Sequence, residues 1–264
     1  MEVTGKTIWI TGASSGIGRE LALKFATHQN QIILSARNVE ALREVADAVK
    51  IAGSEAIVFP VDFSDADRAQ ETASDHMAKL GRVDMAIHAA GISQKATVQE
   101  NSLRVYRSVM EINYFGLISV VKTVLPYMLE AGNGSIVAIS SVAGKVGSRN
   151  RSGYSGSKFA VCGFMDCLRA EVANQGIHCL TVCPGYVKTN IARNALDSAG
   201  SPRGTSTPQI EGGMSPAQCA ERIYHALRKQ KDEVVVSSGV NSWAPLLNRL
   251  FPSLLRKVVA GRDM

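Results

Sequence analysis

Short apolar runs rich in β-branched residues alternate along this chain with longer segments of helical periodicity. The apolar runs predict strands at 7–11, 31–36, 55–62, 83–91, 134–141, 177–185 and 233–238. Apolar residues at helical spacing predict helices at 17–28, 39–53, 65–81, 153–175 and 216–229, and two long helices within 99–131. Strands that are apolar throughout and alternate with helices are typical of a parallel sheet covered on both faces. We therefore predict an α/β fold with one doubly wound parallel sheet in a single domain over residues 1–264.

Length and charge leave several classes of ligand open. The chain has 264 residues, which fits one large domain, and its net charge of +6 is compatible with a polyphosphate ligand, a membrane surface, nucleic acid or simply a solvated basic surface. The five cysteines form no C-x-x-C pair, which indicates a reduced intracellular protein without a metal site. The sequence runs directly into "KTIWITG" and has no apolar stretch of bilayer length, so we expect neither a secretion signal nor a transmembrane helix, and a cytoplasmic location.

Two segments outside the regular alternation are noteworthy. The stretch 190–213 includes "LDSAGSPRGTSTPQIEGG" and is rich in Gly, Ser, Pro and Thr, which predicts either a lid or a disordered loop. The segment 241–262 mixes large apolar residues with Arg249, Arg256, Lys257 and Arg262. It could be a helix packed over a pocket or against a second subunit, or a basic amphipathic segment that rests weakly on an anionic membrane.

A glycine-rich turn, "TGASSGIG" at 11–18, follows the first predicted strand and opens the first helix. Gly12 allows a tight turn, and Gly16 and Gly18 let the backbone approach a pyrophosphate and the helix approach the strand. The amino end of the following helix offers free N–H groups and partial positive charge. A glycine cluster alone could simply make a turn, but its position between strand and helix favours nucleotide binding.

Tyr154 and Lys158, in "SGYSGSKFA", are four residues apart and share one face of the predicted helix. A cation about 4 Å from a phenol, at an effective dielectric near 20, contributes about 4 kcal/mol, enough to bring the pKa of a tyrosine towards neutral pH. Tyr154 could then act as a general acid and base. A surface pair is the alternative, but Ser140 and Ser141 precede it at the end of a strand, where ligands bind in parallel sheets. Only one of these two serines can face the site.

In these motifs the chain resembles the short-chain dehydrogenase/reductase family. "TGASSGIG", Asp62, "INYFG", "GSIVAISSVAG", "YSGSK" and "CPGYVKT" occur in the family's order over residues 5–240. The resemblance implies a Rossmann-like fold and an oxidoreductase that interconverts a carbonyl and an alcohol by hydride transfer with a nicotinamide cofactor. It also implies a homodimer or homotetramer, formed through the helices at 114–131 and 154–175.

The resemblance assigns roles to particular residues. Tyr154 would be the acid–base group, Lys158 would lower its pKa and hold the nicotinamide ribose, Ser141 would bind the substrate oxygen, and Asn113 would bind a water in a proton relay. The cofactor-binding residues would be Gly12, Ser14, Ser15, Gly16, Ile17, Gly18, Arg37, Asp62, Phe63, Ala90, Gly91, Tyr154, Lys158, Pro184, Gly185, Val187 and Thr189. One position departs from the family pattern N-x-A-G: the chain has "HAAG", with His88 in place of the asparagine, and we expect a structural role for it.

The second predicted strand ends "LSAR", which bears on the choice of cofactor. Members of the family that bind NAD(H) carry a carboxylate where this chain has Ala36, and Arg37 could pair with the 2′-phosphate of NADP(H). We therefore expect NADP(H) rather than NAD(H).

The substrate is expected to be a small, apolar carbonyl or alcohol compound bound near Ser93, Gln94, Val142, Val146 and Tyr186. Neither a nucleic-acid partner nor a metal is expected. The alternative function is a nucleotide-binding regulator or scaffold that kept the fold but lost turnover.

Overall fold

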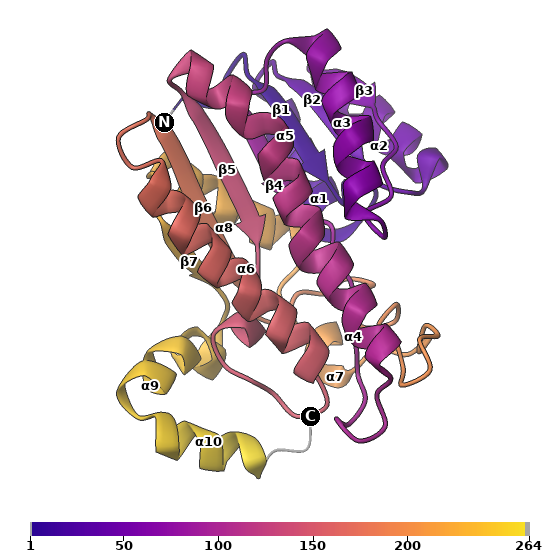
Figure 1. Cartoon of the computed structure of the whole chain (residues 1–264), viewed down its shortest axis with the longest axis vertical. Coiled ribbons are helices and arrows are strands. Elements are labelled where there is room, and N and C mark those ends of the chain that lie inside the picture. Colours follow the sequence, from indigo (N-terminus) through magenta and orange to yellow (C-terminus); the bar gives the residue numbers. More distant parts are fainter. Residues whose placement is uncertain (1, 262–264) are drawn as a thin grey trace.

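The computed structural model describes residues 2–261, and its strands form one seven-stranded parallel sheet in the order β3-β2-β1-β4-β5-β6-β7 (Figure 1). The strands are β1 (Thr7–Thr11), β2 (Gln31–Ser35), β3 (Glu55–Val58), β4 (Met85–His88), β5 (Gly134–Ile139), β6 (Ile177–Pro184) and β7 (Glu233–Val236). Seven strands were predicted, and all seven are present, although β3 and β4 are shorter than expected. The predicted α/β class is thereby confirmed.

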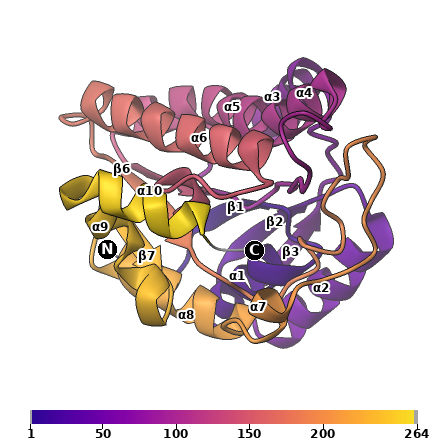
Figure 2. The same cartoon turned by 90° about the horizontal axis from the view of Figure 1, so that it is seen from below.

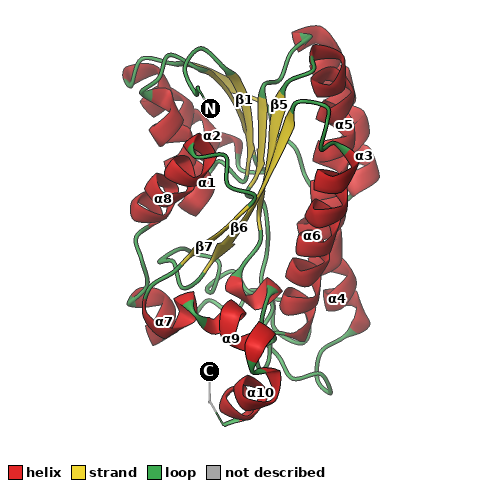
Figure 3. Ribbon diagram, turned by 90° about the vertical axis from the view of Figure 1, so that its left-hand side faces the viewer, coloured by secondary structure: helices red, strands yellow, loops and turns green. Residues whose placement is uncertain are grey.

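Helices cover both faces of the sheet (Figure 3). The helices are α1 (Gly16–Ala26), α2 (Val39–Ile51), α3 (Ala66–Leu80), α4 (Leu103–Met110), α5 (Gly116–Ala131), α6 (Ser152–Glu171), α7 (Pro208–Glu211), α8 (Pro216–Arg228), α9 (Ala244–Leu250) and α10 (Pro252–Ala260). On one face lie α1, α2 and α8, and on the other lie α3, α5 and α6.

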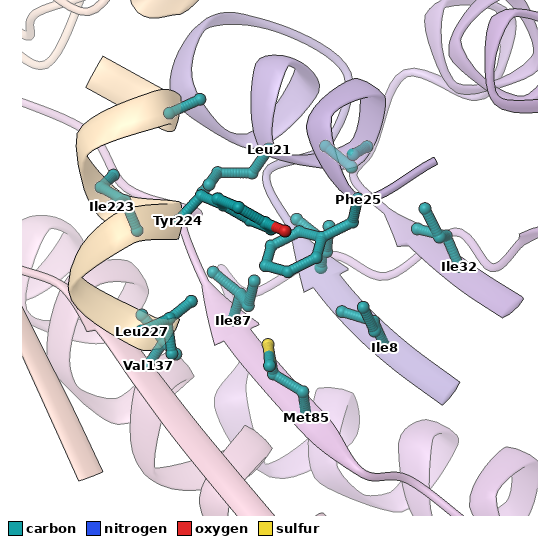
Figure 4. Close-up of a cluster of buried hydrophobic side chains, with 14 of the residues drawn as sticks. Ile8, Leu21, Phe25, Ile32, Met85, Ile87, Val137, Ile223, Tyr224 and Leu227 are labelled. Carbon is teal, nitrogen blue, oxygen red and sulfur yellow. The ribbon is translucent and has the colours of Figure 1, made fainter. Parts of the chain in front are cut away.

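The core between α1, α8 and the sheet shows why these segments fold together. Phe25 of α1 and Tyr224 of α8 meet edge to face with ring centroids 5.7 Å apart, and Leu21 packs in the same buried cluster (Figure 4). Ile8 and Ile87 face them from β1 and β4. Burying side chains of this size stabilises the fold by about 1.5–3 kcal/mol each.

The strand order reverses between β1 and β4, because the chain adds β2 and β3 on one side of β1 and then crosses to β4 on the other. In open parallel sheets, ligands bind at the carboxyl ends of the strands beside such a reversal. Figure 2 looks towards that edge of the sheet. The fold alone therefore directs attention to the segments that follow β1, β4, β5 and β6.

The two helices predicted within 99–131 are present as α4 and α5, although α4 has only eight residues and the two helices are continuous. Residues Leu103–Ala131 form one continuous 29-residue helix, in which the π-helical turn Glu111–Phe115 joins α4 to α5. By length and apolar composition this helix could cross a bilayer, but half of its most apolar window is buried inside the protein. Val120, Val124 and Met128 of α5 are in the core against the sheet. The helix therefore has the position of a core helix.

The two irregular segments also differ in detail from expectation. The predicted lid at 190–213 contains α7 and is held against the loop after β4 by backbone hydrogen bonds. Lys95 N donates to Leu196 O at 2.9 Å, and Leu196 N donates to Ser93 O at 2.9 Å. The C-terminal segment forms two short helices, α9 and α10, that meet at Phe251 rather than one helix. Arg262, at the end of that predicted segment, lies outside the described residues.

Candidate active site

A cavity of about 990 Å³ opens at the carboxyl ends of the strands. It runs from the glycine-rich turn after β1 to Tyr154 on α6, and its size is at the upper end of the range for ligand pockets. All of the residues that the resemblance implies for cofactor binding line it, as do Ser141, Tyr154 and Lys158. Residues from distant parts of the sequence thus meet in one space that is large enough for a dinucleotide and a substrate.

The glycine-rich turn is packed too closely for side chains. An ideal Cβ built on Gly18 would lie 2.3 Å from Gly12 O, and one built on Gly12 would lie 2.7 Å from Ala89 C. Gly12 and Gly16 also have positive φ angles of 66° and 55°. Helix α1 begins at Gly16, and Ser15 at its N-cap position makes no side-chain capping bond. Its first N–H groups are therefore available to an anion, and the tight turn fits the pyrophosphate of a dinucleotide.

The residues that follow β2 and β3 line the cavity beside the glycine-rich turn. Ala36 and Arg37 follow β2 and both line the cavity, and Arg37 is exposed and makes no ion pair with any residue in the range 2–261. Asp62 also lines it and accepts a hydrogen bond from Ser64 N at 3.0 Å through its side chain. A cation without a carboxylate partner beside the place of a ribose suits a phosphate group.

Tyr154 and Lys158 lie on one face of α6, as their spacing predicts, and both are buried. The Lys158 ammonium donates to Ile139 O at 2.8 Å and lies 5.9 Å from the centroid of the Tyr154 ring. An ideal Cβ built on Gly91 would lie 3.4 Å from Lys158 Nζ, so the ammonium lies close beneath the loop after β4. The ammonium is thus fixed between the end of β5 and that loop.

The two serines after β5 point in different directions, and Ser141 is the one that meets the tyrosine. The Ser141 hydroxyl lies close enough to the Tyr154 phenol to lower the pKa of that phenol. It donates to Pro184 O at 3.4 Å and accepts from Ala143 N at 3.0 Å. Ser140 is buried and donates to Lys158 O at 2.9 Å. The first serine therefore supports the backbone of α6, and the second faces the cavity.

Asn113 lies in the π-helical turn between α4 and α5 and is completely buried. Its amide nitrogen donates to Ile92 O at 2.9 Å and to Ser157 Oγ at 2.9 Å, and its Oδ1 accepts from Ile92 N at 2.8 Å. Both N–H donors are used, and one lone pair of Oδ1 remains. Because π-helical turns inside α-helices often occur at functional sites, the geometry is compatible with the expected relay.

The pKa values of the pair differ from the expectation based on charge alone. Burial raises the pKa of Tyr154, while the Ser141 hydroxyl and then the charge of Arg151 act to lower it. Burial also lowers the pKa of Lys158 to about 8. In the protein alone, desolvation of the phenol therefore outweighs the neighbouring charges, and Tyr154 is protonated at neutral pH.

The segment after β6 closes the cavity on its far side. Pro184 ends β6, and Gly185 follows so close to β7 that an ideal Cβ would lie 2.1 Å from Ser237 Oγ. Val187 is buried, and the methyl group of Thr189 would lie 3.1 Å from a Cβ at Gly16. Thr189 thus reaches back to the amino end of α1, across the place expected for the nicotinamide half of the cofactor.

His88, which stands where the family pattern has asparagine, is buried at the end of β4. Its Nδ1 is 3.0 Å from Thr11 Oγ1, which also accepts from Ala90 N at 3.2 Å. Since the threonine hydroxyl accepts from the backbone, we assign its proton to the bond with Nδ1. Burial, and then the charge of Lys158, lower the pKa of His88 to about 3, so the ring is neutral. These contacts tie β1 to β4 and agree with a structural role.

Two residues correct the predicted substrate region. Gln94 does not line the cavity: it is fully buried, and its amide donates to Ala96 O at 3.0 Å and to Asn150 O at 3.2 Å. Arg151, which is not among the residues predicted for the substrate region, lines the cavity, and its charge acts on Tyr154. Its position just before α6, three residues from the tyrosine, was the available signal. Ser93, Val142, Val146 and Tyr186 line the cavity as predicted.

Comparison with known proteins agrees with this geometry. Residues 6–199 match the family model described as short chain dehydrogenase. The chain is 38% identical to dehydrogenase/reductase SDR family member 7B of Mus musculus, covering 96% of this chain and 80% of that protein. It is 37% identical to dehydrogenase/reductase SDR family protein 7-like of Drosophila melanogaster, covering 99% of this chain and 81% of that protein.

Solved structures share the fold along almost the whole chain. A short-chain dehydrogenase from Streptomyces avermitilis has a TM-score of 0.80 at 31% identity and covers 99% of both chains. A short chain dehydrogenase/reductase from Burkholderia phymatum in complex with NAD has a TM-score of 0.83 at 24% identity, covering 100% of this chain and 99% of that chain. The chain therefore belongs to the short-chain dehydrogenase/reductase family of NAD(P)-dependent oxidoreductases.

Proposed function

We propose that the protein is an NADP(H)-dependent oxidoreductase that interconverts a carbonyl and an alcohol, with Tyr154 as its acid–base group. The observation that carries this proposal is the meeting of Ser141, Tyr154 and Lys158 at one end of a cavity whose other end is the glycine-rich turn. Such an arrangement can hold a dinucleotide and a substrate oxygen at the same time. A binding protein without turnover would have no need of the buried phenol and ammonium.

The chain's own residues would then act on the substrate oxygen. Tyr154 gives its proton to that oxygen during reduction and takes it back during oxidation, while the Ser141 hydroxyl donates a hydrogen bond to the same oxygen. Lys158 holds a positive charge beside the phenol. Asn113 bonds both to Ser157 of α6 and to Ile92 in the loop after β4, and so fixes α6 against that loop. When bound, the nicotinamide supplies or accepts the hydride.

The protonation states of Tyr154 and Lys158 bear on the proton transfer. Because burial raises the pKa of Tyr154, the phenol holds its proton at neutral pH and is ready to donate it. Lys158, with a pKa of about 8, is mainly charged under the same conditions. A site that begins with a protonated phenol can donate that proton to the oxygen of a carbonyl substrate.

The preference for NADP(H) rests on Ala36 and Arg37. A carboxylate at position 36 would repel the 2′-phosphate, and Arg37 can donate two parallel hydrogen bonds to it. Charge-assisted bonds of this type contribute about 1.5–3 kcal/mol, which corresponds to a preference of about ten- to a hundredfold. Arg37 lies at the cavity with no ion pair to compete for it among the residues described.

The test is kcat/KM for NADPH and NADH with one carbonyl substrate, in the wild type and in Ala36→Asp/Arg37→Ala. We expect the wild type to prefer NADPH and the double variant to lose or reverse that preference. Arg43→Ala, which removes an exposed arginine from α2, is the matched control and should change nothing. A wild type that prefers NADH would refute the assignment, and nucleotide binding without turnover of any carbonyl would favour the regulatory alternative.

The proposed substrate is an apolar ketone, aldehyde or alcohol. Val142, Val146, Leu196 and Leu255 line the substrate end of the cavity, and Arg151 adds one cation beside the tyrosine. A panel of carbonyl compounds, followed by the absorbance of the reduced nicotinamide, would identify the class. If the panel found only polar, charged substrates to be reduced, this part of the proposal would fail.

We also propose a cytoplasmic homo-oligomer that assembles through α5 and α6. Phe115, in the π-helical turn before α5, and Phe159 of α6 are 45% and 44% exposed, so each helix region offers an apolar side chain to a second subunit. Light scattering at micromolar concentration tests this, and a monomer would contradict it.

A further inference from the structure

Half of the large, exposed apolar side chains among residues 2–261 lie on the last two helices. These six residues, which we call the C-terminal patch, are Trp243, Leu246, Leu250, Phe251, Leu254 and Val258, and they are between 39% and 63% exposed. Figure 3 shows α9 and α10 at one end of the molecule, beyond β6 and β7. A concentration of this kind on a single surface indicates an interaction site rather than scattered exposure.

Four residues of the patch form pairs at helical spacing, and Trp243 and Phe251 directly precede α9 and α10. Leu246 and Leu250 are four residues apart on α9, and Leu254 and Val258 are four apart on α10, so each pair shares a face. The other face is occupied: Leu255 and Val259 line the cavity. Asn248 donates to Lys145 O at 2.8 Å and ties α9 to the loop after Ser141. The inner side of the segment thus belongs to the active site, and the outer side has no partner within residues 2–261.

The charged side chains of α9 and α10 are all positive. Arg249, Arg256 and Lys257 are exposed, and none makes an ion pair with another residue in the described range. The sequence has no Asp or Glu from residue 234 to residue 262, and Asp263 follows. The surface therefore combines large apolar side chains with cations that no carboxylate of α9 or α10 neutralises.

We infer that the C-terminal patch docks on an anionic lipid bilayer. Apolar side chains that include a tryptophan and a phenylalanine, next to unpaired cations on short helices, have the composition of a segment that lies in a membrane interface. Anionic headgroups would neutralise Arg249, Arg256 and Lys257, while the apolar side chains enter the region of the acyl chains.

A second copy of the chain fits this surface less well. In a twofold interface each patch meets its own copy, so the three cations would approach the same three cations with no carboxylate between them. A nucleic acid would match the charge but would leave the six apolar side chains without a role. A negatively charged bilayer satisfies both properties at once.

Docking would also place the mouth of the cavity against the lipid, because Leu255 and Val259 turn inward from the same helix that carries Leu254 and Val258. An apolar substrate could then enter from the bilayer. This consequence rests on the proposed oxidoreductase function, whereas the docking does not depend on it.

The experiment is flotation of the full-length protein with vesicles of phosphatidylcholine, with and without phosphatidylserine, at low and high salt. We expect binding to the phosphatidylserine vesicles that weakens with salt. Leu250→Ser/Leu254→Ser should lose about a hundredfold in vesicle affinity, because two large side chains no longer enter the lipid. Arg256→Gln/Lys257→Gln should lose about thirtyfold on anionic vesicles alone.

Matched variants separate the patch from general effects. Ile51→Ser/Leu103→Ser removes two apolar side chains that are 88% and 70% exposed elsewhere, and Arg43→Gln/Arg107→Gln makes the same change in net charge on α2 and α4. Both should bind like the wild type, and unchanged thermal melting of every variant shows that it is folded. Because flotation does not measure turnover, an inactive enzyme that binds vesicles would overturn the proposed function and leave the docking intact.

Two results would overturn the inference. The first is a wild type that does not float with anionic vesicles at low salt. The second is equal binding by the patch variants and their controls. If light scattering showed that Leu250→Ser/Leu254→Ser dissociates an oligomer while the wild type ignores vesicles, a second copy of the chain would be the partner.

Discussion

Gly18→Ala tests the glycine-rich turn with a single methyl group. The added Cβ would lie 2.3 Å from Gly12 O and 2.8 Å from Gly12 C, distances that real Cβ atoms essentially never show. Gly12 cannot simply move away, because its own Cα already lies so close to the backbone after β4 that a Cβ there would be 2.7 Å from Ala90 N. The turn would have to shift as a unit relative to β1 and β4.

The size of the effect follows from the cost of overpacking. Inserting a methyl group into a closely packed site costs about 1–3 kcal/mol, and at this chain length that lowers the melting temperature by about 2–12 °C. The N–H groups at the start of α1 would move with the turn. If they hold the pyrophosphate, the dissociation constant for NADPH should rise by about ten- to a hundredfold, the value of one or more charge-assisted hydrogen bonds.

Scanning calorimetry and fluorescence titration with NADPH measure the two effects separately. The control is Gly163→Ala on the exposed side of α6, where a Cβ meets nothing within 4 Å. That variant should be more stable by about 0.5–1 kcal/mol, because alanine is the better helix former, and should bind NADPH normally. A Gly18→Ala protein with unchanged melting and unchanged affinity would refute the reasoning. Lower melting with normal affinity would keep the packing argument and reject the phosphate site.

Two further predictions concern the buried polar groups. Tyr154→Phe should lower kcat by more than about a hundredfold and leave NADPH affinity nearly unchanged, since the phenol transfers a proton; a variant that keeps more than about a hundredth of wild-type kcat would contradict the role. His88 has a pKa of about 3 in the folded protein, against an ordinary value of 6.5. The free energy of unfolding should therefore decrease as the pH falls from 6.5 towards 3. The unfolded chain takes up a proton in that range and the folded protein does not, so the free energy of unfolding should fall by about 1.4 kcal/mol per pH unit. Urea unfolding of wild type and His88→Asn measures this slope, and equal slopes would show that His88 is not its source.

Local spacing was enough to predict the parts of the site that lie on one element. Tyr154 and Lys158 share a face because they are four apart on α6. Alternation of side chains in an extended segment predicted that Ser140 and Ser141 point in different directions, and the family resemblance, not the spacing, identified Ser141 as the one beside the tyrosine. The glycine-rich turn followed from its place between a strand and a helix. None of these required knowledge of the sheet order.

The π-helical turn at Glu111–Phe115 could not be predicted in the same way. Its sequence, "EINYF", contains no glycine or proline, and the apolar pattern on both sides is helical. What holds the turn is Asn113, which bonds to Ile92 and Ser157 from two other parts of the chain. The sequence therefore indicated the two helices α4 and α5, whereas the wider turn that joins them depends on contacts with distant segments.

The pKa of Tyr154 shows that the distance to a charge is not enough to predict the pKa of a buried group. From the spacing of Tyr154 and Lys158, a cation about 4 Å from the phenol was expected to favour the phenolate by about 4 kcal/mol. In the structure Lys158 Nζ is bound to Ile139 O and lies 5.9 Å from the ring centroid, and the phenol is buried. Burial disfavours the phenolate, and this outweighs the help from Ser141 and Arg151. The spacing of two residues specifies whether they are neighbours. Their pKa values depend also on how deeply they are buried, and the burial of Tyr154 depends on α6, β5 and the loop after β4 together. Lys158, through its bond to Ile139 O, fixes α6 at the end of β5. Its effect on the pKa of the phenol depends on the cofactor and substrate that the cavity binds.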